Sequence, residues 1–469
     1  MAKYEIKDGV GIIPEGTTII EEEAFYKCTE LKSIVIPDSV TEIGGSAFSG
    51  CTGLTSIVIP DSVTEIGSYA FRGCTGLTGI VIGNSVTNMG YGVFSDCTHL
   101  AGKIIIPDKI TKINDHTFNN CTDLTEIVIP ETVTEIGFGA FGGCTGLKSI
   151  VIPDSVTEIG EYAFQGCTGL TDIIIGNSVE WFGRYAFSDC TGLTSILIPA
   201  SVKGLNYEVF KGCNNLKNIK VAEGNPVYDS RDNCNAIIET ETNKLVVGFA
   251  TTVIPATVLE IEKFAFRDVN IAEIFIHEGI KKIGDFAFEL TGINRIRVAE
   301  GNTVYDSRGD CNAIIETETN SLVMGCSKTI IPDTVTKINN FAFMGCSDLK
   351  EIVIPDSVIE IGVAAFQDSG LKSVVIGKKV KYIEREAFSC KSLETITFRG
   401  SAPKMDKTSY GTETAFKYCE SVKVINVPVG KSSIYARRLH RGNFSGVLGG
   451  EWEGLLVELP VEKKASKRK

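Results

Sequence analysis

Cysteine is the residue type with the widest chemical scope in this sequence, because a thiolate can be a nucleophile, a metal ligand or half of a disulfide. The chain has 15 cysteines. Most lie three residues after a phenylalanine, at Cys28, Cys51, Cys74, Cys97, Cys121, Cys144, Cys167, Cys190, Cys213, Cys346 and Cys419, and Cys390 lies two residues after one. Side chains repeated in register point the same way, which opposes disulfide geometry. We therefore expect buried structural thiols in a reducing setting, with redox or metal roles as the alternative.

The other residue types suited to catalysis are scattered along the chain. The four histidines share no repeat position and form no metal-spaced pair: they are His99, His116, His277 and His440. A G-x-G-x-x-G pattern occurs at Gly137, Gly139 and Gly142, but no helix is predicted after it, so it lacks the context of a dinucleotide site. Nothing singles out one thiol for a Cys–His pair. We predict no catalytic residue, no cofactor and no metal, so the chain is not expected to be an enzyme.

Glutamate recurs at one position of the repeat, in a partial column. Its members are Glu42, Glu65, Glu135, Glu158, Glu260 and Glu360. Other residues interrupt it, namely Asn88, Lys112, Trp181, Gly204 and Lys282. Because a catalytic pair of carboxylates requires one distinctive pocket, we interpret this column as a solvated face.

A repeat of about 23 residues must position all of these side chains. An anchor phenylalanine recurs at this spacing from Phe25 to Phe94 and from Phe118 to Phe210, and the register resumes at Phe266. A period of this length indicates a solenoid. The segment 51–73 reads CTGLTSIVIPDSVTEIGSYAFRG, in which an alternating strand stops at a proline. We expect one continuous parallel sheet, with short irregular or 3₁₀ segments opposite it.

The unit C-x-x-L-x-x-I-x-I-P-x-x-V-x-x-I-G-x-x-A-F-x-x-C resembles the BspA-like, or Treponema pallidum-type, leucine-rich repeats over roughly residues 13–420. The resemblance implies a right-handed leucine-rich-repeat solenoid. It also implies a role in binding extracellular-matrix components or in contact between cells, at a cell surface or after secretion. It carries no catalytic residues. The sequence shows no signal peptide or surface anchor, and from this alone a cytoplasmic location is expected.

Two nearly identical segments interrupt the repeat, and each has the pattern of a β-hairpin. We call residues 221–253 and 298–330 island 1 and island 2. Their Asp and Asn residues lack the spacing of a calcium loop, so we predict a turn role, with metal as the alternative. The expected organisation is one continuous solenoid domain whose segments are 1–25 (N-terminal capping half-repeat), 26–220 (repeats), 221–253, 254–297 (repeats), 298–330, 331–400 (repeats) and 401–469 (last irregular repeat, C-terminal cap and basic tail). A short helix is expected near 432–440.

The outward-pointing position of the predicted strands is apolar in eight consecutive repeats. Its members, which we call the apolar column, are Val35, Val58, Val81, Ile105, Val128, Val151, Ile174 and Leu197, and the next repeat has Lys220. Because monomers rarely expose large contiguous apolar patches, the column predicts a partner site. Two alternatives stay open: these residues serve strand propensity, or polar neighbours such as Ser149 and Asp172 screen them.

Trp181 stands out in the glutamate column, beside Gly204 of the next repeat. The indole either fills the space that the glycine leaves or forms an aromatic hot spot for a partner.

The net charge of −12, with five positive charges in the last seven residues, leaves an acidic body that would repel nucleic acid. No apolar run is long enough to span a membrane. We therefore expect a monomeric, non-enzymatic scaffold that binds a protein or extracellular-matrix ligand. The alternative is a structural spacer or self-assembling rod.

Overall fold

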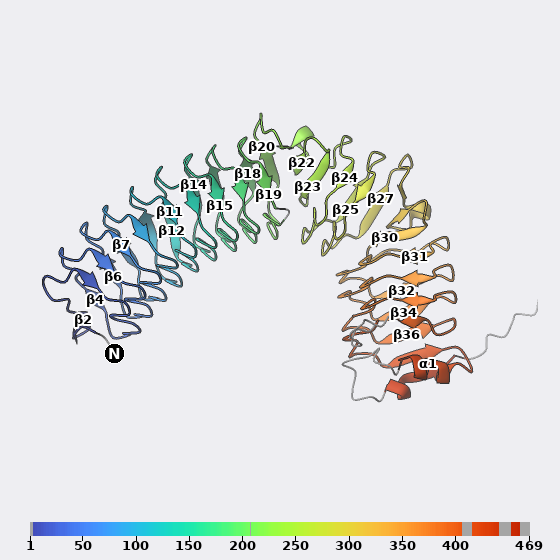
Figure 1. Ribbon diagram of the computed structural model, residues 1–469. Helices are drawn as coiled ribbons and strands as arrows, with labels where there is room; N and C mark the ends of the chain where they lie inside the picture. Colours follow the sequence, from blue (N-terminus) through green and yellow to red (C-terminus); the bar gives the residue numbers. More distant parts are fainter. Residues whose placement is uncertain (1–2, 207, 406–414, 440–451, 460–469) are drawn as a thin grey trace, which may run out of the picture. The chain divides into compact units, whose positions relative to one another are not determined.

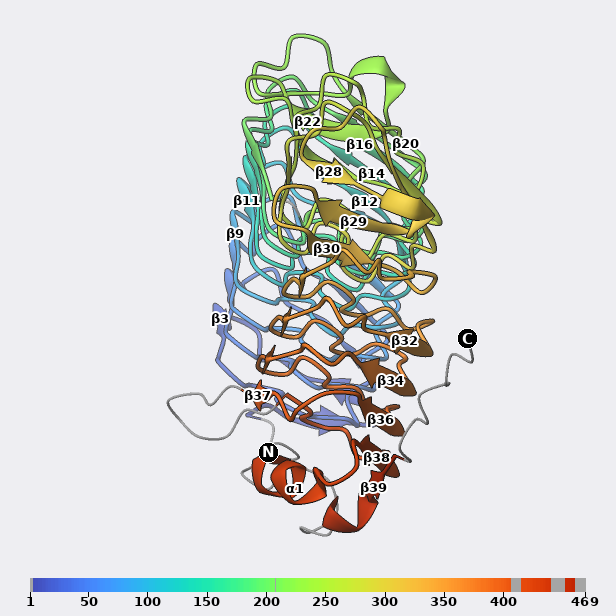
Figure 2. The same ribbon diagram turned by 90° about the vertical axis from the view of Figure 1, so that its right-hand side faces the viewer.

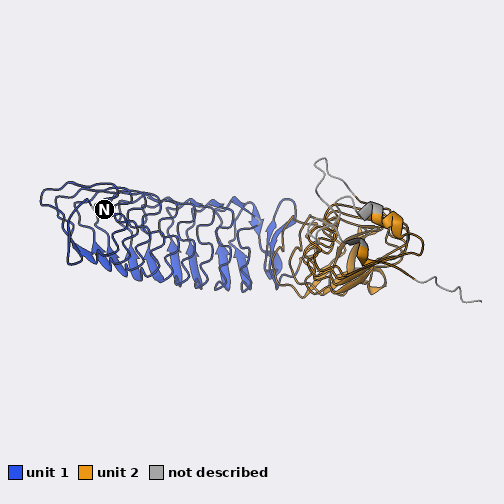
Figure 3. Cartoon of the chain, turned by 90° about the horizontal axis from the view of Figure 1, so that it is seen from below, with its two compact units in different colours: residues 1–253 blue, residues 254–469 orange. Residues whose placement is uncertain are grey.

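The computed structural model describes residues 3–206, 208–405, 415–439 and 452–459. The chain forms two compact units, Met1–Val253 and Ile254–Lys469, which have separate colours in Figure 3. In each unit, short turns of chain stack on one another, as Figure 1 shows. The expected fold class is confirmed: the protein is a right-handed parallel β-solenoid, and its described residues contain almost no helix.

The first side of each turn in unit 1 is a strand at the L-x-x-I-x-I positions, and these strands form the first ladder. They are β4 (Ser33–Ile34), β6 (Ser56–Val58), β8 (Gly79–Val81), β10 (Gly102–Ile105), β12 (Leu124–Val128), β14 (Ser149–Ile152), β16 (Asp172–Ile175), β18 (Ser195–Ile198) and β20 (Asn218–Val221). All pairings in this ladder are parallel. They are grouped in twos, β6 with β8, β10 with β12, β14 with β16 and β18 with β20. The expected sheet is thus present, with its pairing interrupted between these groups.

The second side carries another parallel ladder, built from two-residue strands. These are β3 (Ile19–Ile20), β5 (Glu42–Ile43), β7 (Glu65–Ile66), β9 (Asn88–Met89), β11 (Lys112–Ile113), β13 (Glu135–Ile136), β15 (Glu158–Ile159), β17 (Trp181–Phe182) and β19 (Gly204–Leu205). The sequence does not predict this ladder, because two residues are too few to show a period of two. It forms where the irregular side was expected.

The third side, which we call the turn side, carries the anchor phenylalanines. Their rings stack in the core from repeat to repeat, for example Phe48 on Phe71 with centroids 5.1 Å apart and Phe141 on Phe164 at 5.2 Å. The backbone is also bonded along the stack, since the N–H of Phe48 donates to the carbonyl of Ala70 at 2.7 Å. Each turn thus buries its apolar side chains against the turns before and after it.

Unit 1 begins with a hairpin and ends with island 1. The hairpin pairs β1 (Ile6–Lys7) with β2 (Val10–Gly11), and β2 pairs with the parallel β4. In island 1, β21 (Tyr228–Asp229), a 3₁₀ turn (Arg231–Asn233), β22 (Ala236–Glu239) and β23 (Lys244–Gly248) follow one another, with antiparallel pairing. The predicted hairpin pattern of island 1 is therefore confirmed.

Unit 2 repeats this plan. Its first-ladder strands are β25 (Glu273–Ile276), β27 (Arg295–Val298), β32 (Glu351–Val353), β34 (Ser373–Ile376), β36 (Thr395–Phe398), β38 (Val424–Val427) and β39 (Leu456–Glu458). Its second-ladder strands are β24 (Glu260–Ile261), β26 (Lys282–Ile283), β31 (Lys337–Ile338), β33 (Glu360–Ile361), β35 (Tyr382–Ile383) and β37 (Lys404–Met405). Figure 2 shows β32, β34, β36, β38 and β39 side by side.

Island 2 and the C-terminal cap complete unit 2. Island 2 comprises β28 (Tyr305–Asp306), a 3₁₀ turn (Arg308–Asp310), β29 (Ala313–Glu316) and β30 (Ser321–Gly325), again with antiparallel pairing. The cap contains α1 (Ser432–Leu439), which agrees with the predicted short helix, and a 3₁₀ turn (Trp452–Leu455). Tyr435 of α1 is fully buried, packs on Phe398 at 4.8 Å between ring centroids, and donates a hydrogen bond to the Gly400 carbonyl.

Candidate binding surfaces

The apolar column is aligned by strand register on the outer face of the first ladder. Val58 pairs with Val81, Ile105 with Val128, and Val151 with Ile174. Leu197 pairs with Lys220, so the charged residue marks the end of the column. The buried residues between them, such as Ile57 and Ile150, point into the core. The alternation that the sequence predicts is therefore present.

Every member of the column is exposed, from 36% for Val128 to 77% for Val35. The neighbouring polar column includes Ser149 and Asp172, which pair with each other, and the ion pair between Lys103 and Glu126 at 2.7 Å. These side chains flank the apolar column without covering it. Screening by polar neighbours therefore does not explain the column, whereas strand propensity stays a competing explanation.

Trp181 lies on β17 of the second ladder, so the structure does not bring it together with the apolar column. Its ring lies against Gly204 of β19, where an added Cβ would come within 2.0 Å of Cζ3. The interpretation that the indole fills the space beside the glycine is thus confirmed. Trp181 is still 53% exposed, so its role as a partner contact stays a prediction.

The glutamate column also lies on the second ladder, where lysines pair with several of its members. Lys112 contacts Glu135 at 2.6 Å, and Lys337 contacts Glu360 at 2.6 Å. Glu65 is exposed and accepts a hydrogen bond from Asn88 at 3.2 Å. This is the solvated face that the sequence predicts.

The cysteine ladder is buried, as predicted, with only Cys346 partly accessible. Each thiol of the regular repeats donates a hydrogen bond to the carbonyl of the anchor phenylalanine one repeat earlier: the Cys144 Sγ lies 3.1 Å from the Phe118 oxygen. Burial raises the pKa of Cys144, and likewise of Cys97, to about 12. A protonated, buried thiol is neither a nucleophile nor a ready metal ligand. Sequence reasoning recognised the ladder but missed its hydrogen bonds.

The histidines occupy unrelated environments. His99 is exposed, whereas His116 is half-buried and packs edge-on against Phe138 at 5.0 Å. His277 is buried, and its Nδ1 accepts a hydrogen bond from the Gly279 N–H at 3.0 Å. Burial lowers the pKa of His277. His440 lies outside the described residues.

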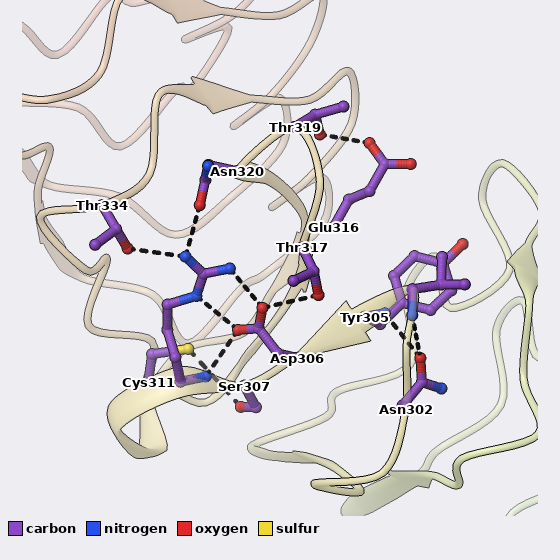
Figure 4. A network of polar contacts seen from close by, with 12 residues as sticks. Asn302, Tyr305, Asp306, Ser307, Cys311, Glu316, Thr317, Thr319, Asn320 and Thr334 are labelled. Carbon is purple, nitrogen blue, oxygen red and sulfur yellow. Dashed lines mark hydrogen bonds and ion pairs between the residues drawn. The ribbon is translucent and has the colours of Figure 1, made fainter.

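Island 2 holds a network of polar contacts, drawn in Figure 4. The Asp306 carboxylate accepts hydrogen bonds from the Arg308 Nε at 2.7 Å and from the Thr317 hydroxyl at 3.0 Å, and Arg308 also donates to Asn320 at 2.6 Å. Island 1 repeats the pattern around Arg231. Because these oxygens are engaged within the protein, the predicted turn role is confirmed. Among all described residues, no three His, Cys, Asp or Glu side chains form a group that could hold a metal ion.

The turn side carries two concave features that the sequence reasoning missed. In unit 1, the rings of His116, Phe138, Tyr162 and Tyr185 follow one another with centroids 5.0–5.2 Å apart. His116, Phe138 and Tyr162 border a shallow groove of about 480 Å³. The signal was present in the sequence, as aromatic residues two or three positions before successive anchor phenylalanines.

In unit 2, a cavity of about 340 Å³ lies between the turns at 283–293 and 339–348. No sequence motif marks this cavity, because it forms where island 2 contributes no turn to the turn side of the stack. In the part of the chain that the structure describes, no helix has the length and apolar character needed to cross a membrane.

The stacked parallel ladders define the class of protein, which is a leucine-rich-repeat solenoid. The sequence comparison defines the family. Residues 11–125, 111–234, 238–309 and 314–441 match the BspA type leucine rich repeat region, in six copies. The chain belongs to this family. No curated protein matches it.

Several solved structures are similar. A leucine-rich repeat protein from Bacteroides ovatus is 22% identical, with a TM-score of 0.42 over 96% of this chain and 94% of the other. A leucine rich cell surface protein from Faecalibacterium prausnitzii is 24% identical, with a TM-score of 0.43 over 89% and 86%. The leucine rich repeat protein of T. pallidum is 34% identical, with a TM-score of 0.32 over 34% of this chain and 77% of that one.

Proposed function

We propose that this protein is a non-enzymatic scaffold that binds a protein or extracellular-matrix partner through the apolar column of unit 1. The observation that carries the proposal is the alignment of eight exposed aliphatic side chains on adjacent turns. Covering such a side chain releases roughly 1 kcal/mol when about half of its surface is still exposed. A partner that covers all eight gains roughly 8 kcal/mol, which is comparable with the estimated cost of association.

The chemistry of the remaining surface supports a scaffold rather than an enzyme. The thiols of the regular ladder are buried and protonated, as for Cys144, and the glutamates pair with lysines or face solvent, as for Glu135 and Glu65. A matrix partner requires that the protein reach the outside of the cell. We therefore also propose a surface or secreted location, which protease treatment of intact cells that produce the protein would test.

The proposal is tested by binding to immobilised collagen, fibronectin and laminin. The variant Val128→Lys/Val151→Lys places two charges at the centre of the column and is expected to weaken binding at least tenfold. The matched control is Thr134→Lys/Thr157→Lys, which adds the same charge at exposed positions that precede β13 and β15 of the second ladder. This control is expected to bind within twofold of the unaltered chain. Equal binding by both variants, or no binding of the unaltered chain to any of the three proteins, contradicts the proposal.

The alternative function, a self-assembling rod, uses the same apolar column as a contact between copies. Light scattering over a wide range of protein concentration distinguishes the two. A mass that stays at one chain supports the binding scaffold, whereas a mass that grows with concentration and falls for Val128→Lys/Val151→Lys supports the rod.

A further inference from the structure

On the turn side of regular repeats, alternate backbone groups pass hydrogen bonds from one turn to the next. In unit 2, the N–H of Phe266 donates to the carbonyl of Ala287 at 2.8 Å, and the N–H of Phe343 donates to the carbonyl of Ala365 at 2.7 Å. The N–H groups two residues before and two residues after each of these phenylalanines also donate to carbonyls of the next turn. Each turn therefore offers three donors to the next. This side of the solenoid is thus a third hydrogen-bonded edge.

Island 2 interrupts that edge. Its strand β30 pairs with β31, so the second ladder continues across the island. The hairpin contributes no turn of its own to the turn side, where the segments 283–293 and 339–348 face each other across the cavity of about 340 Å³. We call this cavity the turn slot. It has the size of typical ligand pockets.

One wall of the turn slot presents backbone donors and the opposite wall presents acceptors. The N–H groups of Phe286, Phe288 and Leu290 occupy the donor positions of a regular turn, and they have no hydrogen-bond acceptor among the described residues. Opposite them, the carbonyls of Asn340 and Met344 receive no hydrogen bond from any residue that the structure describes. Backbone N–H and C=O groups are strong hydrogen-bonding groups, so these unpaired donors and acceptors are available to a partner.

The carbonyl between those two acceptors, that of Ala342, accepts from the Gly325 N–H at 2.9 Å and keeps a second lone pair. The slot therefore has the two hydrogen-bonding edges that a missing layer of backbone would satisfy.

Side chains border the floor and the ends of the turn slot. The Phe343 ring lies so near Gly325 that an added Cβ would come within 2.1 Å of it, which seals the slot from the core. Phe286 and Phe341 meet at one end with centroids 4.2 Å apart. Leu290 meets Gly345 at the other end. The opening therefore has apolar borders, and the partly exposed side chains of Phe286 and Leu290 must turn outward to admit a peptide.

We propose that the turn slot binds a short peptide segment of a partner protein, which enters as the missing turn. The carbonyls of the peptide accept from Phe286, Phe288 and Leu290, and its alternate amides donate to Asn340 and Met344. Donors on one wall and acceptors on the other, spaced by two residues, complement the two edges of one polypeptide and not a small apolar molecule. This site is separate from the apolar column of unit 1 and does not depend on it.

The probe is a synthetic nonapeptide that copies residues 361–369, IGVAAFQDS. In the native stack, the carbonyls of this segment accept from Phe341, Phe343 and Gly345, so it carries the required pattern. Fluorescence anisotropy of the labelled peptide measures binding to the full chain. We expect the peptide to bind at least tenfold more tightly than a scrambled peptide. Hydrogen exchange at residues 286–290 should slow when the peptide is added.

Met344→Trp fills the slot and is expected to weaken peptide binding at least tenfold. Gln367→Trp is the matched control, because residue 367 has the same position one repeat later, next to a regular turn. It should bind within twofold of the unaltered chain. If thermal unfolding shows that Met344→Trp does not fold, Ser327→Trp, which also lines the slot, takes its place.

A peptide N-methylated at the positions of Ala364, Phe366 and Asp368 lacks the amides that face the next turn and should bind at least tenfold more weakly. The proposal would be overturned if the scrambled or the methylated peptide bound as tightly as the native peptide. It would also be overturned if the native peptide bound Met344→Trp as tightly as the unaltered chain. So would binding of a small apolar dye, displaced by Met344→Trp, without any binding of the peptide.

Discussion

The indole of Trp181 covers Gly204 on the adjacent turn, and a Cβ at residue 204 would come within 2.0 Å of the ring. The two residues act as one packing unit, in which a large side chain occupies the space beside the smallest. The indole sits on a ladder face, with its outer surface in solvent.

Gly204→Ala is therefore expected to push the Trp181 ring outward. Because the ring is half-exposed and can rotate, the free energy of unfolding should fall by only about 1 kcal/mol. The chain has two tryptophans, so emission measured in a Trp452→Phe background reports on Trp181 alone. We expect a shift of the emission to longer wavelength. The same background with Glu135→Ala, on a strand that does not adjoin β17, should show no shift. An unchanged spectrum for Gly204→Ala would contradict this packing.

Cys144→Ala tests the role of the cysteine ladder. It removes a buried side-chain atom and the hydrogen bond to the Phe118 carbonyl, which still accepts from the Cys121 N–H. We expect a loss of about 1–2 kcal/mol in the free energy of unfolding, measured by denaturant titration. Thr145→Ala, next to it and exposed, should cost less than about 0.5 kcal/mol.

Reagents for thiols supply an independent check on the ladder. A pKa of about 12 leaves almost no thiolate at Cys144 near pH 8. Alkylation followed by mass spectrometry should leave Cys144 unmodified in the folded protein and modify it fully after denaturation. Rapid modification of the native protein at Cys144 would show that the ladder is reactive.

Stability near pH 6 depends on His277. Its Nδ1 accepts a hydrogen bond from the Gly279 N–H, and protonation of that atom would break the bond. Because burial lowers the pKa of His277, its contribution is present above the unfolded pKa near 6.5 and is lost as the pH falls below it. The free energy of unfolding should therefore decrease between about pH 7 and pH 5.

His277→Asn keeps an acceptor that does not titrate, so it should reduce this decrease. The lowered pKa values of Asp229 and Asp306 affect stability only at more acidic pH. A pH dependence that His277→Asn leaves unchanged would rule out this origin.

The sequence predicted the features that recur at a fixed spacing. Register alone aligns Val58 with Val81 and Val151 with Ile174, so the exposed column followed from the period. The second ladder could not be predicted from the period, because residues such as Glu65 and Ile66 form a strand only when the adjacent turns supply partners. The turn slot did not follow either, since it depends on backbone groups of Phe288 that island 2 leaves without a neighbouring turn.

Arg308→Lys tests the island network, and Arg231→Lys is its counterpart in island 1. Although partial burial alone would raise the pKa of Asp306, hydrogen bonds from the Arg308 side chain and backbone hold it below its usual value. Lysine keeps the charge but loses the forked geometry and the bond to Asn320. We expect each variant to lose about 1–2 kcal/mol in the free energy of unfolding, measured by denaturant titration. A cost for only one variant would show that the two islands are not equivalent.

The most direct test of the binding scaffold is hydrogen exchange of the full chain, alone and with whichever of collagen, fibronectin or laminin it binds. The account predicts slower exchange in the first-ladder strands from β10 to β18, around Val128 and Val151, and little change in the second-ladder strands β11 to β17. Slower exchange confined to the second ladder, or no change in unit 1, would contradict the assignment of the apolar column as the binding surface.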